Sequence, residues 1–144
     1  ATQVRQQLTE ERRADVAPMV HAAFRLEGSA QIDASPTLVR IVLGALLMNA
    51  YDAVEGSDAT FIEVRLREDP VQIEVANDGP AIPETSRAAI FDPFVSSPPH
   101  SRFRSGLGLT AAKRLAERYN GTLELIRSDE TETRFRFAPG QSKA

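Results

Sequence analysis

The chain contains no cysteine, which excludes a disulfide framework and a thiolate metal site. It also has no apolar run of the ~18 residues that a membrane helix needs. Its longest apolar stretch, residues 41–48, is typical of one face of a buried helix. Acidic and basic residues are scattered and the net charge is only −3, so no basic surface for nucleic acid is indicated. No signal peptide pattern is present either, and these absences together fit the cytosol.

What is present suits one globular domain, because 144 residues of which 42% are hydrophobic can bury a core. The chain begins with Ala1 rather than methionine, which is typical of a piece of a longer protein. Residues 1–13 are polar and are expected to be a linker or the tail of an upstream helix. We expect the domain itself to cover residues 14–138, followed by a tail at 139–144.

Hydrophobic periodicity predicts helices and strands in alternating groups. Serine followed by proline at Ser35 and Pro36 predicts a capped helix start, and that helix is expected to end near Val54. The full set of expected elements is a helix at 14–24, an extended piece at 30–34, a helix at 35–54, strands at 60–67 and 71–76, a short helix at 84–89, a helix from 106–109 to 119–121, and strands at 122–127 and 133–137.

The strand pairs are expected to be hairpins. Ile62, Val64 and Leu66 alternate with polar residues, so the first pair should bury one face. The order of helices, hairpin, helix and hairpin predicts an α+β fold. We expect a two-layer α/β sandwich whose sheet is mixed, largely antiparallel and covered on one face by helices.

Three tracts indicate a nucleotide site. In the first, Asn49 interrupts an apolar helix face and Asp52 follows one turn later on the same side. An amide oxygen beside a carboxylate suits Mg²⁺, a hard cation that takes one or two protein ligands. An asparagine that caps a neighbouring loop explains the first tract equally well.

The second tract, residues 77–83, follows a strand and contains the turn-forming Asp78 and Gly79; an ordinary turn is the alternative. The third, residues 104–110, is glycine-rich and opens a helix. Its backbone amides and the positive end of the helix dipole would suit phosphate oxygens. The spacing matches neither the Walker A loop nor the Rossmann fingerprint.

These tracts, in their order and spacing, resemble the GHKL superfamily, and within it the sensor histidine kinases most closely. Residues 46–53 are similar to its N box, 77–83 to its G1 box, 90–94 to its F box and 106–115 to its G2 box. The resemblance runs over nearly the whole chain. It implies an ATP-binding catalytic domain that uses ATP and Mg²⁺.

The resemblance also assigns roles to single residues. Asn49 would hold the Mg²⁺, Asn77 would contact the adenine amino group with Thr133 in support, and residues 95–105 would form a lid over ATP. The complete set of implied contacts to the nucleotide is Asn49, Asp52, Asn77, Gly79, Ala81, Ile82, Phe91, Arg102, Arg104, Ser105, Gly106, Leu107, Gly108, Leu109 and Thr133. It assigns no catalytic side chain within this chain.

Three positions depart from the family pattern. Ala45 stands where a polar residue is usual, Asn77 replaces the adenine-binding aspartate, and Ala81 replaces a glycine. Ala45 removes the carboxylate that activates water in the superfamily's ATPases, so ATP hydrolysis is not expected. Two alternatives therefore remain open: a degenerate binding or scaffold module without kinase activity, and a serine kinase of the anti-sigma-factor type.

The two histidines do not stand in a phosphoacceptor context, because His21 lies in an apolar stretch and His100 in the lid. The resemblance thus implies an acceptor histidine on dimerisation and phosphotransfer helices outside this chain. It further implies ATP and ADP as ligands, a response regulator as partner, a homodimer for the full-length protein and a monomer for the chain alone. The expected location is the cytoplasm, as part of a two-component signalling system that includes membrane-bound sensors.

Overall fold

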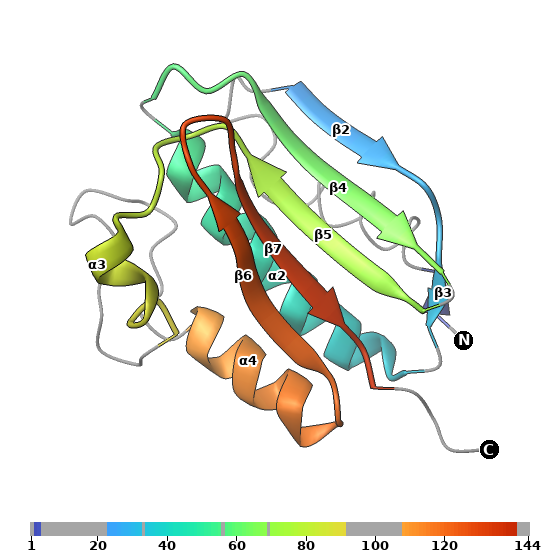
Figure 1. The fold of residues 1–144 in the computed structure, drawn as a ribbon. Helices are drawn as coiled ribbons and strands as arrows, with labels where there is room; N and C mark the ends of the chain where they lie inside the picture. The colour runs from blue at the N-terminus through green and yellow to red at the C-terminus, as the bar shows by residue number, and fades with distance from the viewer. Residues whose placement is uncertain are drawn as a thin grey trace.

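A computed structural model describes the chain at residues 2–3, 23–32, 34–55, 57–68, 70–91 and 108–140. The described residues form two layers, a five-stranded sheet with helices on one face (Figure 1). The strands of this sheet are β2 (Ala23–Glu27), β4 (Phe61–Arg67), β5 (Gln72–Asn77), β6 (Thr122–Ser128) and β7 (Thr133–Ala138). The helices are α2 (Pro36–Val54), α3 (Glu84–Arg87) and α4 (Gly108–Arg118). A small separate sheet pairs β1 (Thr2–Gln3) with β3 (Gln31–Ile32).

The strand order in the main sheet is β2-β4-β5-β7-β6. Strand β2 runs parallel to β4, and the pairs β4–β5, β5–β7 and β7–β6 are antiparallel. The predicted α+β sandwich, with a mixed and largely antiparallel sheet, is therefore confirmed. Helix α2 lies behind the sheet in Figure 1, and α4 lies beside β6 and packs on α2.

Helix α2 forms as its sequence predicts. The Ser35 hydroxyl accepts a hydrogen bond of 3.1 Å from the Thr37 amide, and Pro36 begins the helix. By length and hydropathy α2 qualifies as a membrane span, but half of that stretch is buried and core helices meet the same criterion. Its inward face lies in the core, with buried Leu38, Val39, Val42, Leu43, Leu46, Leu47, Ala50, Tyr51 and Val54.

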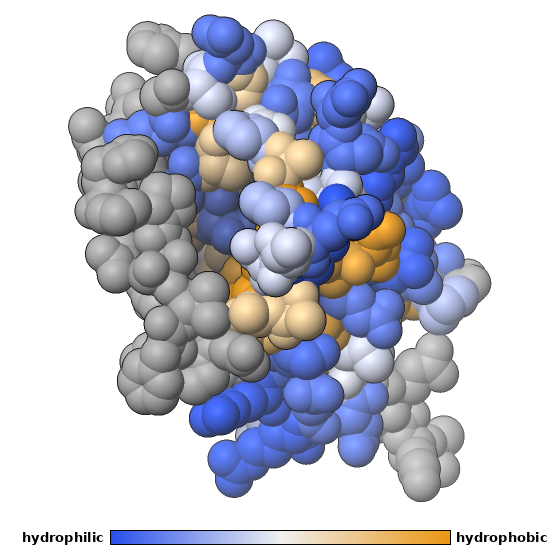
Figure 2. All heavy atoms as spheres, turned by 60° about the vertical axis from the view of Figure 1, so that its left-hand side comes forward, coloured by the Kyte–Doolittle hydropathy of each residue, from blue (hydrophilic) through white to orange (hydrophobic). Residues whose placement is uncertain are grey.

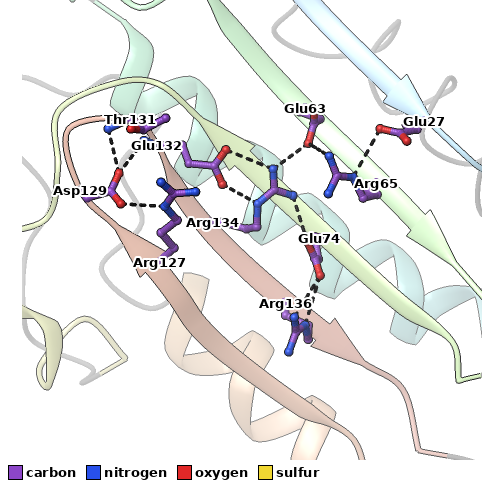
Figure 3. Close-up of polar contacts among 10 residues, drawn as sticks. All are labelled: Glu27, Glu63, Arg65, Glu74, Arg127, Asp129, Thr131, Glu132, Arg134 and Arg136. Carbon is purple, nitrogen blue, oxygen red and sulfur yellow. Dashed lines mark hydrogen bonds and ion pairs between the residues drawn. The ribbon is translucent and has the colours of Figure 1, made fainter.

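The first hairpin, β4–β5, is confirmed, and Ile62, Val64 and Leu66 face the core. The expectation that only one face of the hairpin is buried is wrong for β5. Glu74 on the opposite face is also buried, because Arg134 and Arg136 of β7 lie across its carboxylate at 3.0 and 3.2 Å (Figure 3).

The N-terminal part of the chain differs from its prediction. Ala23 and Phe24, expected at the end of a helix, belong to β2, while the rest of that predicted helix lies outside the described residues. Thr2 and Gln3, expected in a linker or a helix tail, form the short strand β1. Pairing with β4 overrides the local helical pattern at β2, because tertiary contacts decide short segments of this kind.

Helix α4 ends where predicted. Asn120 adopts a left-handed conformation with φ 66°, and the Gly121 amide donates to the Ala116 carbonyl at 2.8 Å. A side chain at Gly121 would lie 2.7 Å from the Ala138 carbonyl oxygen, so glycine allows the chain to pass closely into β6. The sheet is thereby held against α4.

Candidate functional site

Three polar side chains lie next to one another at one end of the sheet. Asn77 ends β5, Thr133 begins β7 and Ser128 ends β6, and the register pairs Thr133 with both of the others. By strand alternation Asn77 and Thr133 share the helix-covered face with Val75 and Phe135. We call these three residues the polar row; each is at most 6% exposed. In Figure 1 the row lies at the upper left, where α2 also ends.

The polar row is tied to the loop that follows β5. The Asn77 Oδ1 atom accepts a hydrogen bond of 2.9 Å from the Gly79 amide, and the Ser128 hydroxyl accepts one of 2.8 Å from the Ile82 amide. The hydroxyls of Ser128 and Thr133 are hydrogen-bonded to each other at 2.8 Å. The loop therefore folds back over the row through its own backbone amides.

Gly79 brings this loop against helix α2. A Cβ atom at Gly79 would lie 2.6 Å from the carbonyl oxygen of Ala53, a distance that Cβ atoms essentially never adopt. Only glycine allows this approach, so the first two sequence tracts meet in space as expected. Asn49 and Asp52 lie on the same side of α2 as Ala53, both partly exposed at the edge of its buried face.

Asp78 has a structural role at the other side of the loop. Its carboxylate accepts hydrogen bonds from the Thr60 and Phe61 amides at 2.8 and 2.9 Å and from the Thr60 hydroxyl. Burial raises the pKa of Asp78, but these hydrogen bonds outweigh it and hold the pKa below its ordinary value. Asp78 is thus hydrogen-bonded to the start of β4, whereas its neighbour Asn77 belongs to the polar row.

Phe91, from the F-box-like residues 90–94, is held against helix α4. Its carbonyl oxygen accepts a hydrogen bond from the Thr110 hydroxyl, and its ring meets Phe135 edge-on with centroids 6.1 Å apart. The Lys113 ammonium group lies 4.9 Å from the Phe91 ring centroid and donates to the Leu123 carbonyl at 3.0 Å. The start of α4, at Gly108 and the half-buried Leu109, therefore lies beside Phe91.

Two residues that contact this loop, Arg87 and Ser128, were not predicted from the sequence. The Arg87 guanidinium donates to the carbonyl oxygens of both Ile82 and Ser128, so this residue of α3 connects the loop to the end of β6. Ser128 and Arg87 carry no signal in the sequence, because each resembles an ordinary turn or surface residue. Figure 2 shows this side of the molecule, where hydrophobic residues form a narrow, partly recessed band among hydrophilic ones.

The remaining predicted site residues are exposed or lie outside the described residues. Ala81 is exposed on the loop. Arg102, Arg104, Ser105, Gly106 and Leu107 lie outside the described residues, as do the predicted lid, His21 and His100. Their roles remain predictions.

The residues present fit a nucleotide. Small-molecule sites combine apolar walls with a few fixed polar groups, and the polar row beside Ile82 and Gly79 provides both. The N-terminus of the eleven-residue helix α4 offers amides suited to phosphate oxygens. Asn49 and Asp52 supply the oxygen ligands that Mg²⁺ prefers.

Comparison with known proteins supports this assignment. Residues 34–142 match the family model of histidine kinase-, DNA gyrase B- and HSP90-like ATPases. The sensor histidine kinase GlrK of Escherichia coli is 34% identical over 131 residues, which cover 88% of this chain and 27% of that protein. The sensory histidine kinase/phosphatase NtrB of Rhodobacter capsulatus is 34% identical over 106 residues, which cover 65% of this chain and 29% of that protein. The chain thus spans about a quarter of the length of these relatives.

Solved structures show the same fold. The catalytic domain of the histidine kinase ThkA superposes with a TM-score of 0.77 and 22% identity, covering 99% of this chain and 97% of that one. The ATP-binding domain of PrrB from Mycobacterium tuberculosis gives a TM-score of 0.70 and 20% identity, covering 98% of this chain and 96% of that one. The chain therefore belongs to the family of histidine kinase-, DNA gyrase B- and HSP90-like ATPases, as an ATP-binding domain of the type found in sensor histidine kinases.

Proposed function

We propose that this chain binds Mg-ATP and transfers the γ-phosphoryl group to a histidine on the dimerisation helices of its full-length protein. The phosphoryl group would then pass to a response regulator, and the full-length protein would be a cytoplasmic or membrane-anchored homodimer. The observation that carries the proposal is the buried polar row, closed by a loop whose Gly79 touches α2.

Each end of the nucleotide has residues to receive it. Asn77, with Thr133 beside it, would contact the base, while Gly79, Ala81 and Ile82 would form the wall of that subsite. The amides at the start of α4 would receive the phosphates, and the charged side chains Arg102 and Arg104 would add contacts there. Phosphoryl transfer depends mainly on positioning and on stabilising charge, so this division of the site suits the reaction.

Asn49 would hold Mg²⁺, with Asp52 one turn away. Bound Mg²⁺ would neutralise charge on the phosphate oxygens during transfer. Asn49 lies on a helix whose other face is packed into the core, so the backbone that would carry this ligand is held in place.

Ala45 favours transfer over hydrolysis. It lies one turn before Asn49 on α2, and its methyl group cannot take a proton from water. A histidine side chain is itself a nucleophile and needs no such base. The site would therefore hold ATP without turning it over rapidly until an acceptor histidine is presented.

The proposal is tested by titrating the chain with Mg-ATP. Replacing Asn49 by alanine removes a contact to a charged group, so Mg-ATP affinity should fall by roughly tenfold or more. The matched control is Met48→Ala, an exposed neighbour on the same helix, which should leave the affinity unchanged. Equal affinities in folded wild-type and Asn49→Ala protein would reject Asn49 as the Mg²⁺ ligand. No binding by the wild type would favour the degenerate module instead.

A further inference from the structure

The hydrogen bond between Asn77 and Gly79 determines how the Asn77 amide is oriented. The Gly79 N–H group needs an acceptor, and the NH₂ group of an amide has no acceptor to offer. The atom 2.9 Å from the Gly79 nitrogen must therefore be Oδ1, as the structure has it. The hydrogen-bonding chemistry therefore distinguishes the oxygen end of this amide from its nitrogen end.

The group that Asn77 has left for a ligand is consequently its NH₂ donor. The side chain is 1% exposed and lies on the inner face of the sheet at the polar row. Within the described part of the chain, the one hydrogen bond of the Asn77 side chain is the bond that Oδ1 accepts from Gly79. The Asn77 nitrogen is not among the fully buried unpaired atoms of the described residues, so its NH₂ group is open to a ligand that brings an acceptor.

We propose that Asn77 makes this subsite accept purines with a carbonyl at position 6, hypoxanthine and guanine, at least as well as adenine. The inference rests on the proposed function, which places the purine edge at Asn77. A 6-carbonyl oxygen accepts directly from the Asn77 NH₂ group. An adenine amino group is itself a donor, so it cannot pair with the Asn77 NH₂ group. It could donate to the second lone pair of Oδ1, but the NH₂ group would then have no partner.

Binding of three nucleotides by the wild-type chain is the primary test. Calorimetric titration with the Mg²⁺ complexes of ATP, inosine triphosphate and GTP compares a 6-amino purine with two 6-oxo purines. Inosine triphosphate lacks the 2-amino group of guanine, so it isolates the effect of position 6. We expect it to bind as tightly as ATP or more tightly. ATP binding more than roughly tenfold tighter than inosine triphosphate would overturn the inference.

Asn77→Asp should reverse the preference. One carboxylate oxygen would still accept from Gly79, while the other becomes an acceptor for the adenine amino group and repels a 6-carbonyl oxygen. The ratio of ATP to inosine triphosphate affinity should rise by roughly five- to 150-fold, the effect of one buried polar group left unpaired. ADP should tighten alongside ATP.

The matched control is Asn120→Asp, the same chemical change at an exposed residue. Asn120 lies just before the start of β6, whereas the polar row lies at the end of that strand. This substitution should leave the ratio unchanged. If Asn77→Asp changes both affinities by one factor, Asn77 does not read position 6 and the inference fails while the proposed function stands. If the wild type binds none of the three nucleotides, both fail. Should Asn77→Asp not fold, the wild-type ratio alone decides.

Discussion

At the scale of single residues, Gly79 stands where helix α2 leaves no room for a side chain. A methyl group there would lie 2.6 Å from the Ala53 oxygen and 2.9 Å from Asn77 Oδ1. Both neighbours are held firmly, one by the backbone of a core helix and the other by burial in the polar row. A larger residue must therefore displace the loop that covers the polar row, where the base is proposed to bind.

Gly79→Ala should destabilise the chain by about 1–3 kcal/mol, as overpacking does, and weaken nucleotide binding. The control is Gly44→Ala in the interior of α2, where an added Cβ meets no atom within 4 Å. That change should stabilise the chain by about 0.5–1 kcal/mol, since alanine is the better helix residue. Urea unfolding measures both, and equal shifts for the two variants would contradict the close contact.

At the scale of elements, ion pairs join strands β4, β5 and β7 across the outer face of the sheet (Figure 3). The Arg134 guanidinium contacts Glu63 at 2.7 Å, Glu74 at 3.0 Å and Glu132. Only 9% of the Arg134 side chain is exposed. Arg127 of β6 and Asp129 of the neighbouring turn also pair, at 2.7 Å, but both are about half exposed. The first set replaces apolar packing on this face, and the second is a surface pair.

Replacing Arg134 by methionine should destabilise the chain by on the order of 2–4 kcal/mol, because Glu74 then keeps a buried charge with only Arg136 beside it. Arg127→Met, the matched removal of an exposed guanidinium, should cost less than about 1 kcal/mol. Chemical unfolding at neutral pH compares them. A loss for Arg134→Met no larger than for Arg127→Met would show that the buried network adds no stability.

At the scale of the whole molecule, the sandwich brings two sides of the site together. The sheet end supplies the polar row, α2 supplies Asn49 and Asp52, and α4 begins beside Phe91. Helices α2 and α4 pack on each other, so these groups hold their relative positions. Under the proposed function, this arrangement would hold the nucleotide while the dimerisation helices present the acceptor histidine.

With γ-labelled ATP, the chain by itself should acquire no label, because transfer requires an acceptor within near-attack distance. Adding the dimerisation helices of the full-length protein should produce label on their histidine, and acid treatment should remove it. The control replaces that histidine by alanine, which should abolish the label. Label on His21 or His100 of the chain alone would contradict the prediction. A sigma factor as the partner of the chain, in place of the dimerisation helices, would favour the serine kinase alternative.

The sequence by itself determined the features that depend on neighbouring residues. Ser35 and Pro36 start α2 by local capping, Ile62 to Leu66 alternate because a strand has period two, and Asn120 with Gly121 ends α4 through a left-handed turn. The four ordered boxes indicated the family, and the family resemblance implied that Asn77, Thr133 and Gly79 belong to one subsite.

Tertiary structure decided what depends on residues far apart in the chain. β2 is a strand because β4 pairs with it, and Glu74 is buried because arginines of β7 lie over it. Ser128 joined the site through the β6–β7 register, which no local pattern specifies. The direction of the Asn77 amide followed from the Gly79 N–H group that faces it. Each of these outcomes rests on a partner that only the folded chain brings within hydrogen-bonding or packing distance.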